Sequence, residues 1–222
     1  MNLKSLREQA YELLKERLGD GALRPGAAVH VDSMAASLGV SRTPLREALL
    51  QLAHEGFVTI HPRRGIVVSE LSLDDIRHIY EIIGALESAV ILGAGARLGS
   101  EEATRMRVLN EEMRAALATD DFNRYYARNL DFHDVYLVLS ANAALVRIVR
   151  TLKARLYDFP RREGYVREWE MASVDEHDAI VMRIAAEDRR AAADYVRDIH
   201  WSYAVQEPFV RRYYAATRER SV

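Results

Sequence analysis

Leu38–Leu50 has the sequence LGVSRTPLREALL, which is typical of the turn and second helix of a helix-turn-helix. Gly39 supplies the conformational freedom that a tight turn between two helices needs. Ser41 suits the N-cap position, where its hydroxyl would accept a hydrogen bond from the first helical turn. Pro44 is tolerated in that turn because the first N–H groups of a helix have no helical partner. The sequence therefore predicts a helix that begins near Arg42.

Apolar residues recur along this predicted helix at steps of three and four. They are Leu45, Ala48, Leu49 and Leu52. Such a stripe faces the core, which leaves Arg42, Thr43 and Arg46 together near the start of the helix. In helix-turn-helix proteins these first residues enter the major groove, where arginine binds the O6 and N7 atoms of guanine. The pattern predicts a DNA-recognition helix.

A basic turn follows between two runs of β-prone residues, 57–60 and 66–68. The turn contains Pro62, Arg63, Arg64 and Gly65, so we expect a two-stranded wing with arginines at its tip. Wing arginines suit contact with phosphates or the minor groove. The alternative is that all these arginines lie on an ordinary solvated helix face and hairpin tip. Their coincidence with a turn and a wing favours DNA contact.

The chain has 222 residues, enough for two modest domains that each bury a core. Its formal net charge of −2 would argue against nucleic acid as a partner, because phosphate binding depends on basic residues. The segment from Val40 to Gly65, however, contains four arginines and only two glutamates, so its local charge is positive. There is no cysteine, no run of about eighteen apolar residues and no apolar signal core near the N-terminus. We expect a soluble, cytoplasmic protein that does not bind membranes.

The composition changes near residue 70. Before it, residues 3–18 form an amphipathic pattern that predicts the first helix of a winged helix-turn-helix domain, 1–70, with three helices and a small β-wing. After it, Ser72 suits a helix N-cap, and almost only helical periodicity follows. The expected helices cover 73–99, 100–119, 121–140 and 142–159, with two more around His177 and His200. We predict a mainly α protein whose second domain, 71–222, is an all-helical bundle of about six helices.

Three histidines occupy inner positions of this predicted bundle. Asn129 and His133 are four residues apart, so they share one helix face. His177 and His200 lie on the apolar stripes of two later helices. Histidines that converge with a side-chain oxygen inside a bundle form metal sites, whereas a single histidine on an apolar face is more often a hydrogen-bonded core residue. The residues alone leave both interpretations open.

The first seventy residues resemble the N-terminal domain of GntR-family transcription regulators. The segments that carry this resemblance are GALRPG at 21–26, LGVSRTPLREAL at 38–49, EGFV at 55–58 and RRG at 63–65. The resemblance implies that Ser41, Arg42, Thr43 and Arg46 are the recognition-helix contacts. It also implies that Gly65 lies at the wing tip, beside the two wing arginines.

The second domain resembles the helical FCD effector domain of the FadR-type branch of that family. The matching segments are 129–133, 140–142, 176–180 and the later His200. Many members hold a divalent metal, often zinc, through one Asp or Asn and three His. The resemblance thus implies Asn129, His133, His177 and His200 as ligands. Asn brings no charge, so we expect lower metal affinity or a carboxylate effector that completes the shell. The imidazole content favours zinc over nickel or manganese.

One departure from the family concerns the effector. Members commonly have an arginine three residues before the Leu-Glu pair of the first bundle helix, where it pairs with a small organic acid. Here that pair is Leu86-Glu87, and the arginine position is Ile83. Arg147 or Arg150 would have to supply the charge, and Tyr80 is a candidate for lining the pocket. Gly84 indicates either a packing notch or room for a ligand.

The leading hypothesis is a ligand-responsive repressor of a metabolic operon. A homodimer would place two recognition helices on palindromic double-stranded DNA, and an organic acid bound near the metal would change that binding. One alternative is a regulator for which the metal ion itself is the signal. Another is a metal-dependent hydrolase with a DNA-binding appendage, which needs a general base. The nearest acids, Asp131 and Glu176, are expected to point away from their neighbouring histidines, so we predict no enzyme.

Overall fold

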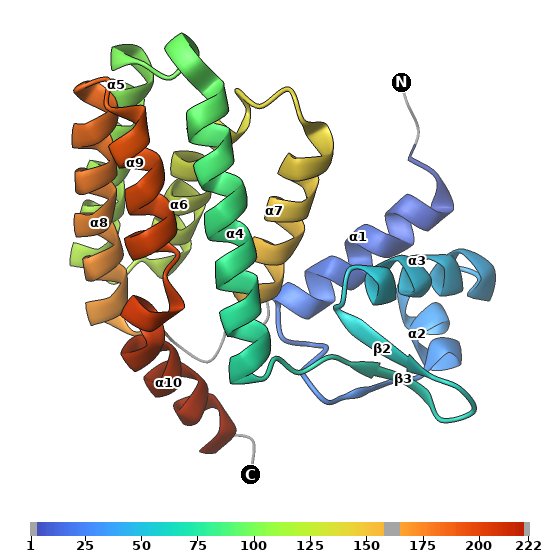
Figure 1. The fold of residues 1–222 in the computed structure, drawn as a ribbon. Helices are drawn as coiled ribbons and strands as arrows, with labels where there is room; N and C mark the ends of the chain where they lie inside the picture. The colour runs from blue at the N-terminus through green and yellow to red at the C-terminus, as the bar shows by residue number, and fades with distance from the viewer. Residues whose placement is uncertain (1–3, 158–164, 220–222) are drawn as a thin grey trace. The chain divides into compact units, whose positions relative to one another are not determined.

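The computed structural model describes residues 4–157 and 165–219. The chain divides into two compact units, Met1–Ser72 with Lys153–Gly164 and Leu73–Leu152 with Tyr165–Val222. Each unit is described by itself below, and Figure 1 shows the elements of both.

The N-terminal unit contains three helices and a small antiparallel sheet (Figure 1). The helices are α1 (Leu6–Gly19), α2 (Val31–Leu38) and α3 (Arg42–His54), and the strands are β1 (Ala28–Val29), β2 (Val58–His61) and β3 (Gly65–Val68). The sheet has the order β1-β3-β2, so β3 is the central strand. The predicted wing is confirmed, but the prediction lacked β1. Two residues are too few to show an alternating pattern, and only pairing with β3 makes β1 a strand.

Local signals account for the ends of these helices. Ser5 and Glu8 form a capping box at α1, in which the Glu8 N–H donates to Ser5 Oγ and the Ser5 N–H donates to the Glu8 carboxylate. Gly39 ends α2 in the left-handed conformation, with φ of 66°, as the tight turn requires. The core joins α1, α3 and the sheet through Leu14, Leu18, Leu45, Leu49, Leu52, Phe57 and Val68. The predicted apolar stripe of α3 is therefore buried, and its first residues are left outside.

The second unit is helical throughout its described residues. Its elements are α4 (Leu73–Ala94), a 3-10 turn (Gly95–Arg97), α5 (Ser100–Ala118), α6 (Phe122–Leu137), α7 (Ala143–Tyr157), α8 (Arg167–Ala185), α9 (Arg189–Tyr195), a π-helical turn (Val196–His200) and α10 (Tyr203–Glu219). The last turn of α7, from Lys153 on, is counted with the first unit. Helices α4, α5, α6, α8 and α9 lie side by side in Figure 1. Aspartates cap the N-termini of two of these helices. Asp121 accepts a hydrogen bond from the Arg124 N–H at the start of α6, and Asp188 accepts one from the Ala191 N–H at the start of α9.

The expected helix around His200 is the main difference in the bundle. It is divided into α9, the π turn and α10, so the described residues of the bundle contain seven α-helices where about six were expected. The Trp201 N–H donates to the Val196 carbonyl, five residues back, which defines the π turn. No glycine or proline occurs between Arg189 and Tyr203, so no breaker in the sequence indicates this interruption.

One described stretch, Leu73–Arg97, is long and apolar enough to pass a membrane-span test of length and composition. Half of its most apolar window is buried inside the bundle. Helix α4 supplies that burial through Ile76, Ile83 and Ile91, which are fully enclosed. The core helix of a helical bundle has the same properties, so this match is weak support for a membrane span.

Candidate metal centre and nucleic-acid interface

Three histidines from different elements meet inside the bundle. His133 comes from α6, His177 from α8 and His200 from the last position of the π turn. All three are buried, and they offer nitrogen atoms that lie within 4.8 Å of one another. Imidazole nitrogens bind zinc at about 2.0–2.1 Å, so a small movement of the rings brings all three into the shell of one ion. The structure thus brings together the three histidines that the sequence singled out, and they can hold a metal.

His133 has oxygen partners at one ring nitrogen. Its Nδ1 atom lies 2.6 Å from the Tyr136 hydroxyl and 3.1 Å from Glu87 Oε2. Glu87 is completely buried, and its Oε2 atom also accepts hydrogen bonds from the Tyr136 hydroxyl and from the Trp201 indole. These contacts favour a proton on Nδ1 of His133 and a lone pair on Nε2. Metal-bound histidines are commonly oriented in this way.

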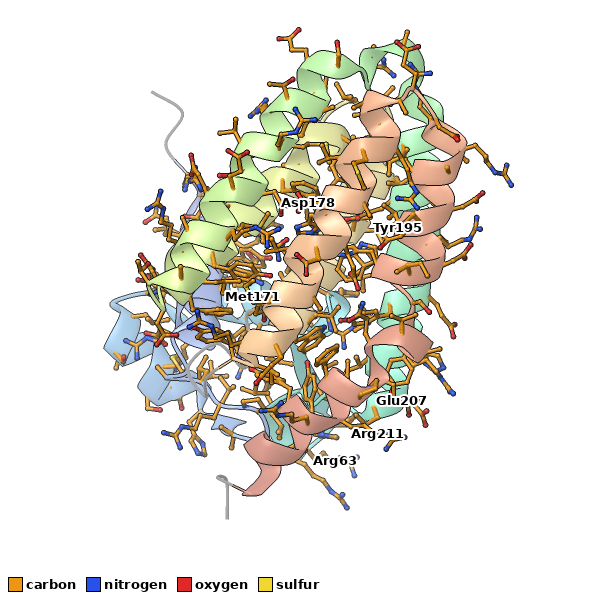
Figure 2. All side chains as sticks on the ribbon, turned by 90° about the vertical axis from the view of Figure 1, so that its left-hand side faces the viewer. Arg63, Met171, Asp178, Tyr195, Glu207 and Arg211 are labelled. Carbon is orange, nitrogen blue, oxygen red and sulfur yellow. The ribbon has the colours of Figure 1, made fainter. Side chains whose placement is uncertain are left out.

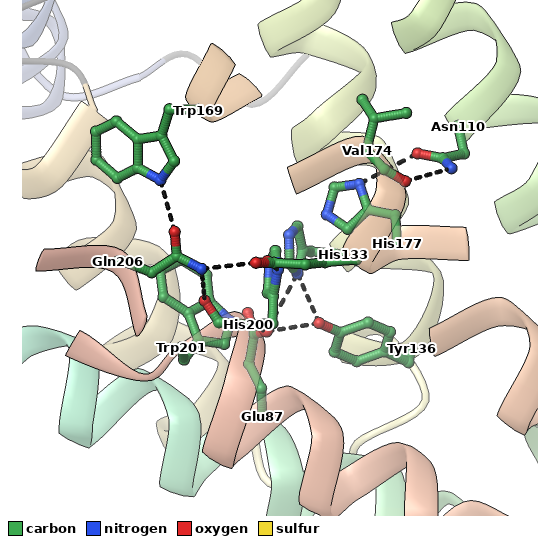
Figure 3. A network of polar contacts seen from close by, with 11 residues as sticks. Glu87, Asn110, His133, Tyr136, Trp169, Val174, His177, His200, Trp201 and Gln206 are labelled. Carbon is green, nitrogen blue, oxygen red and sulfur yellow. Dashed lines mark hydrogen bonds and ion pairs between the residues drawn. The ribbon is translucent and has the colours of Figure 1, made fainter. Parts of the chain in front are cut away.

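The other two histidines have the same arrangement with different partners (Figure 3). His200 Nδ1 lies 2.7 Å from Glu176 Oε2, and His177 Nδ1 lies 3.3 Å from Asn110 Oδ1. The Asn110 amide in turn donates to Asp178 Oδ1 at 2.6 Å. Asp178 is visible on α8 in Figure 2, and its second oxygen pairs with an arginine of α5 at 2.7 Å. The contacts at Nδ1 orient each ring, and a bound metal would then take Nε2.

Asn129 lies on α6, one helical turn before His133. Its Oδ1 atom is buried and has no hydrogen-bond partner among the described residues. A buried acceptor that is left unsatisfied costs about 1–3 kcal/mol, whereas a cation beside it would satisfy it. Three imidazoles and one amide oxygen are a donor set that suits zinc and related divalent ions. The residues present therefore fit a metal.

Glu87 and Asn110 are site residues that the sequence-based prediction missed. Each is a polar residue on an otherwise apolar inner stripe: Glu87 follows Ile83 by one turn of α4, and Asn110 lies between Met106 and Met113 on α5. Buried charged and amide side chains are uncommon and need partners. That anomaly was a usable signal, although it does not reveal which histidine each residue meets.

Glu176 contacts a histidine that the expectation did not consider. Its carboxylate was expected to point away from its neighbour His177, and in the structure it contacts His200, because the π turn lies against α8 at this position. Sequence spacing related Glu176 only to its neighbour His177. Asp131 does lie away from the centre, since its carboxylate pairs with Arg128 at 3.1 Å and is half exposed.

The effector candidates are scattered. Tyr80 is buried and packs edge-to-face against Trp201, with ring centroids 5.3 Å apart. Arg147 and Arg150 are exposed on α7, and Arg150 pairs with Asp134 at 2.9 Å. None of the hydrogen bonds or ion pairs of the described residues joins either arginine to the histidines.

Gly84 serves close packing between α4 and the π turn. A Cβ atom at this position would lie 3.0 Å from Trp201 Cβ and 3.4 Å from the Arg197 carbonyl oxygen. The absence of a side chain lets Trp201 approach α4 and donate to Glu87. The packing-notch interpretation of this glycine therefore fits the structure.

On the N-terminal unit, Ser41, Arg42, Thr43 and Arg46 are all exposed at the start of α3. Ser41 has the backbone of an N-cap residue, but its hydroxyl makes no capping hydrogen bond, contrary to expectation. The usual donors are the second and third N–H groups of the helix, and the third position is Pro44, which has none. One of the two usual donors is therefore missing, and Ser41 lies exposed at the surface.

Arg42 is oriented by the preceding helix. Its Nε atom lies 2.9 Å from Asp32 Oδ1, and the two side chains are 68% and 71% exposed. An ion pair this exposed contributes about 0–1 kcal/mol. Arg42 can therefore exchange Asp32 for a phosphate or a base at little cost.

The wing tip is a tight turn closed by a hydrogen bond of 3.1 Å from the Arg64 N–H to the His61 carbonyl. Pro62 occupies its second position. Arg63 occupies the third with φ of 63°, in the left-handed region that favours glycine. Residues 61–65 are all exposed. An exposed arginine held in a strained conformation is a candidate for contact with a partner.

This strain leads to a prediction. Arg63→Gly removes a left-handed cost of about 1–2 kcal/mol, and the greater freedom of glycine in the unfolded chain offsets part of the gain. We expect the free energy of unfolding in urea to stay level or rise slightly. DNA affinity should fall for every sequence, with a salt slope reduced by about one. A stable variant with unchanged affinity would remove Arg63 from the interface.

The chain combines two parts. One is a helix-turn-helix with an arginine-bearing recognition helix and a wing, and the other is a helical bundle around three histidines. This combination defines a class of protein, the DNA-binding regulator with a separate ligand-binding domain. Comparison with known families agrees. Residues 6–68 match the model of bacterial regulatory proteins of the gntR family, and residues 78–200 match the FCD domain. The chain belongs to the GntR family, in its FadR-type branch with an FCD domain.

Relatives and solved structures are consistent with this assignment. An uncharacterized HTH-type transcriptional regulator of Agrobacterium vitis is 33% identical over 135 residues, 60% of this chain and 79% of that protein. The Nta operon transcriptional regulator of Aminobacter aminovorans is 30% identical over 135 residues, 60% of this chain and 63% of that protein. The structure of E. coli McbR/YncC has a TM-score of 0.72 and 22% identity, and the match covers 96% of this chain and 99% of that one. Such relatives are transcriptional regulators and not enzymes.

Proposed function

We propose that this protein is a homodimeric, effector-responsive repressor of a metabolic operon that acts in the cytoplasm. The observation that carries the proposal is the pairing of an exposed recognition helix with a buried histidine centre in one chain. The relatives support the finer points: E. coli RspR, a transcriptional repressor, is 24% identical over 147 residues, and the Aminobacter relative regulates the Nta operon. We assign DNA binding to a domain of residues 1–70 and effector binding to residues 71–222.

The proposed DNA contacts lie on two elements. Ser41, Arg42, Thr43 and Arg46 enter the major groove from α3, and Arg63, Arg64 and Gly65 meet the backbone or minor groove from the wing. A two-fold symmetric dimer would place two such helices about 34–36 Å apart, one turn of DNA, on a palindromic operator. The exposure of all seven residues supports this assignment.

The proposed metal is zinc, held by His133, His177, His200 and Asn129. When bound, the ion supplies a fixed positive charge to which an anionic effector can attach. The four protein ligands are all neutral, and Ile83 replaces the arginine that relatives commonly use for an acid. We therefore propose a small organic acid whose carboxylate finds its main partner at the metal.

Regulation requires that the effector bind two arrangements of the dimer with different affinity, because equal binding shifts no equilibrium. Strand β3 ends at Val68 and α4 begins at Leu73, so only four residues join the wing to the first bundle helix. A short connection of this kind limits how far the wing can move independently of α4. We propose α4 as the element that carries the change.

An operator-binding titration distinguishes effector control from metal control. Fluorescence anisotropy would be measured on labelled operator DNA with apo protein, with zinc alone, and with zinc plus a panel of small carboxylic acids. The proposal expects zinc alone to leave affinity nearly unchanged and one acid to change it at least tenfold in the presence of zinc. A full response to zinc alone would instead establish the metal as the signal.

Arg46→Ala tests the recognition helix. Loss of a bidentate contact to guanine should weaken operator binding by about 1–3 kcal/mol and relax base preference at one position. Arg7→Ala, an exposed arginine on α1, is the matched control and should leave affinity unchanged. Competition with single-base operator variants measures the preference. Unchanged affinity for Arg46→Ala would show that the recognition helix is misplaced.

A further inference from the structure

The four proposed metal ligands share one chemical property: all are neutral. Three are imidazoles, and the fourth is the amide oxygen of Asn129, where a carboxylate would have brought a negative charge. A divalent ion bound only by neutral groups in a buried place keeps its full charge at a high cost in solvation. Tight binding therefore requires negatively charged groups outside the ligand shell that offset the positive charge of the ion.

Two carboxylates stand directly behind two of the ligands. Glu87 contacts Nδ1 of His133 and Glu176 contacts Nδ1 of His200, at 3.1 Å and 2.7 Å. His177 has the neutral Asn110 amide at the same position. The three imidazoles thus differ in one respect, the charge of the group behind them. Figure 3 labels the three histidines together with Glu87 and Asn110.

Glu87 is enclosed in the bundle and held there by two hydrogen-bond donors. The Glu87 side chain is 0% exposed, and a single oxygen accepts from the Trp201 indole at 2.7 Å and from the Tyr136 hydroxyl at 2.5 Å. Hydrogen bonds to an ionised acceptor are about twice as strong as those between neutral groups. The donors come from α6 and from the residue after the π turn, so they fix the carboxylate against His133.

Glu176 is fixed by a chain of amide and indole groups. Its Oε1 atom accepts from Gln206 Nε2 at 2.8 Å, while the Oε2 atom faces His200. The Gln206 carbonyl accepts from the Trp169 indole at 2.8 Å, which settles the orientation of the amide. Both carboxylate oxygens of Glu176 therefore have a hydrogen-bond partner, and for Oε2 that partner is the proposed ligand His200.

We propose that Glu87 and Glu176 are positioning residues that supply the negative charge missing from Asn129. Each carboxylate draws the Nδ1 proton of its imidazole, makes Nε2 a stronger donor to the metal and offsets the charge of the ion. The inference rests on the proposed metal centre and adds to it the source of its affinity. Loss of a hydrogen-bond partner of this kind typically lowers metal affinity by about 10–100-fold.

The test is a zinc titration of the full-length apo protein against a chromophoric chelator. Glu87→Gln and Glu176→Gln should each weaken zinc binding about 10–100-fold. Glu168→Gln is the matched control, because Glu168 lies on the same helix as Glu176 and is 64% exposed. Asn129→Asp should strengthen binding in the wild type and restore it in the Glu176→Gln background. If Glu176 had a purely structural role, Asn129→Asp would strengthen binding by the same factor in both backgrounds, whereas the proposal expects a larger factor where Glu176 is lost.

The outcomes separate the two proposals. Wild-type protein that binds no zinc overturns the metal centre and this inference with it. Wild-type protein that binds zinc, with both Gln variants within twofold of it, overturns the inference and leaves the metal centre standing. Circular dichroism checks folding. If Glu87→Gln does not fold, Glu176→Gln and its rescue by Asn129→Asp decide the matter alone.

Discussion

Replacement of His177 by alanine is expected to abolish stoichiometric zinc binding. His177 is one of three histidines that can hold the ion, and the Asn110 amide fixes its ring. Two imidazoles and an amide oxygen make an incomplete tetrahedral set, so we expect affinity to fall by at least a hundredfold. Elemental analysis of protein purified without chelators or a histidine tag would give the metal content directly.

The matched control for this substitution is His78→Ala. His78 lies on α4 in the same bundle but is exposed, so its loss should leave one zinc per chain. Thermal unfolding with and without added zinc provides a second measurement, since a ligand that binds only the folded state raises its stability. The wild type and His78→Ala should be stabilised by zinc, and His177→Ala should not. Full metal content in His177→Ala would contradict the proposed ligand set.

The second large effect expected is on the pH dependence of stability, through Glu170. Burial on α8 raises the pKa of this carboxyl group from its ordinary 4.5 to about 7, and the neighbouring Tyr125 hydroxyl opposes part of that shift. Between these values the folded protein keeps the proton that the unfolded chain releases. Stability therefore falls as the pH rises from about 4.5 to about 7, and then stays level.

Glu170→Gln should remove this part of the pH dependence, because glutamine stays neutral at every pH. One pKa unit corresponds to about 1.4 kcal/mol, so a shift of this size should make the variant more stable than the wild type by about 3 kcal/mol at pH 8. At pH 4 the two should be nearly equal. Urea unfolding at both pH values measures the difference, with the exposed Glu168→Gln as control. Equal stability at pH 8 would show that Glu170 is ionised without cost.

The recognition helix could be predicted because the sequence signals that define it lie within a few residues of one another. Gly39, Pro44 and the apolar spacing of Leu45 and Leu49 each act within a few residues, and the structure confirms the turn and the buried stripe. The exception is the Ser41 hydroxyl. Its expected capping bond is absent, and Pro44 removes one of the two usual donors, although the N–H of Thr43 remains.

The histidine centre was predictable only in part. Helical spacing placed His133 and His177 on inner faces, and the family resemblance suggested that they meet. Their partners depend on how separate helices align, which spacing within one helix cannot give. Glu87 lies 46 residues from His133, and Glu176 lies 24 residues from His200. The π turn also lacked any breaker residue that would have indicated it.

The π turn makes the histidine centre sensitive to chain length. This turn spans five residues between the Val196 carbonyl and the Trp201 N–H, one more than an α-helical turn allows. Each residue of a helix advances it by about 100°, so deletion of one residue here would swing His200 away from its two partners. Substitution of the exposed Arg197 or Asp198 changes no such angle. In this chain the position of His200 therefore depends on the number of residues in the turn and not on the chemistry of its exposed side chains.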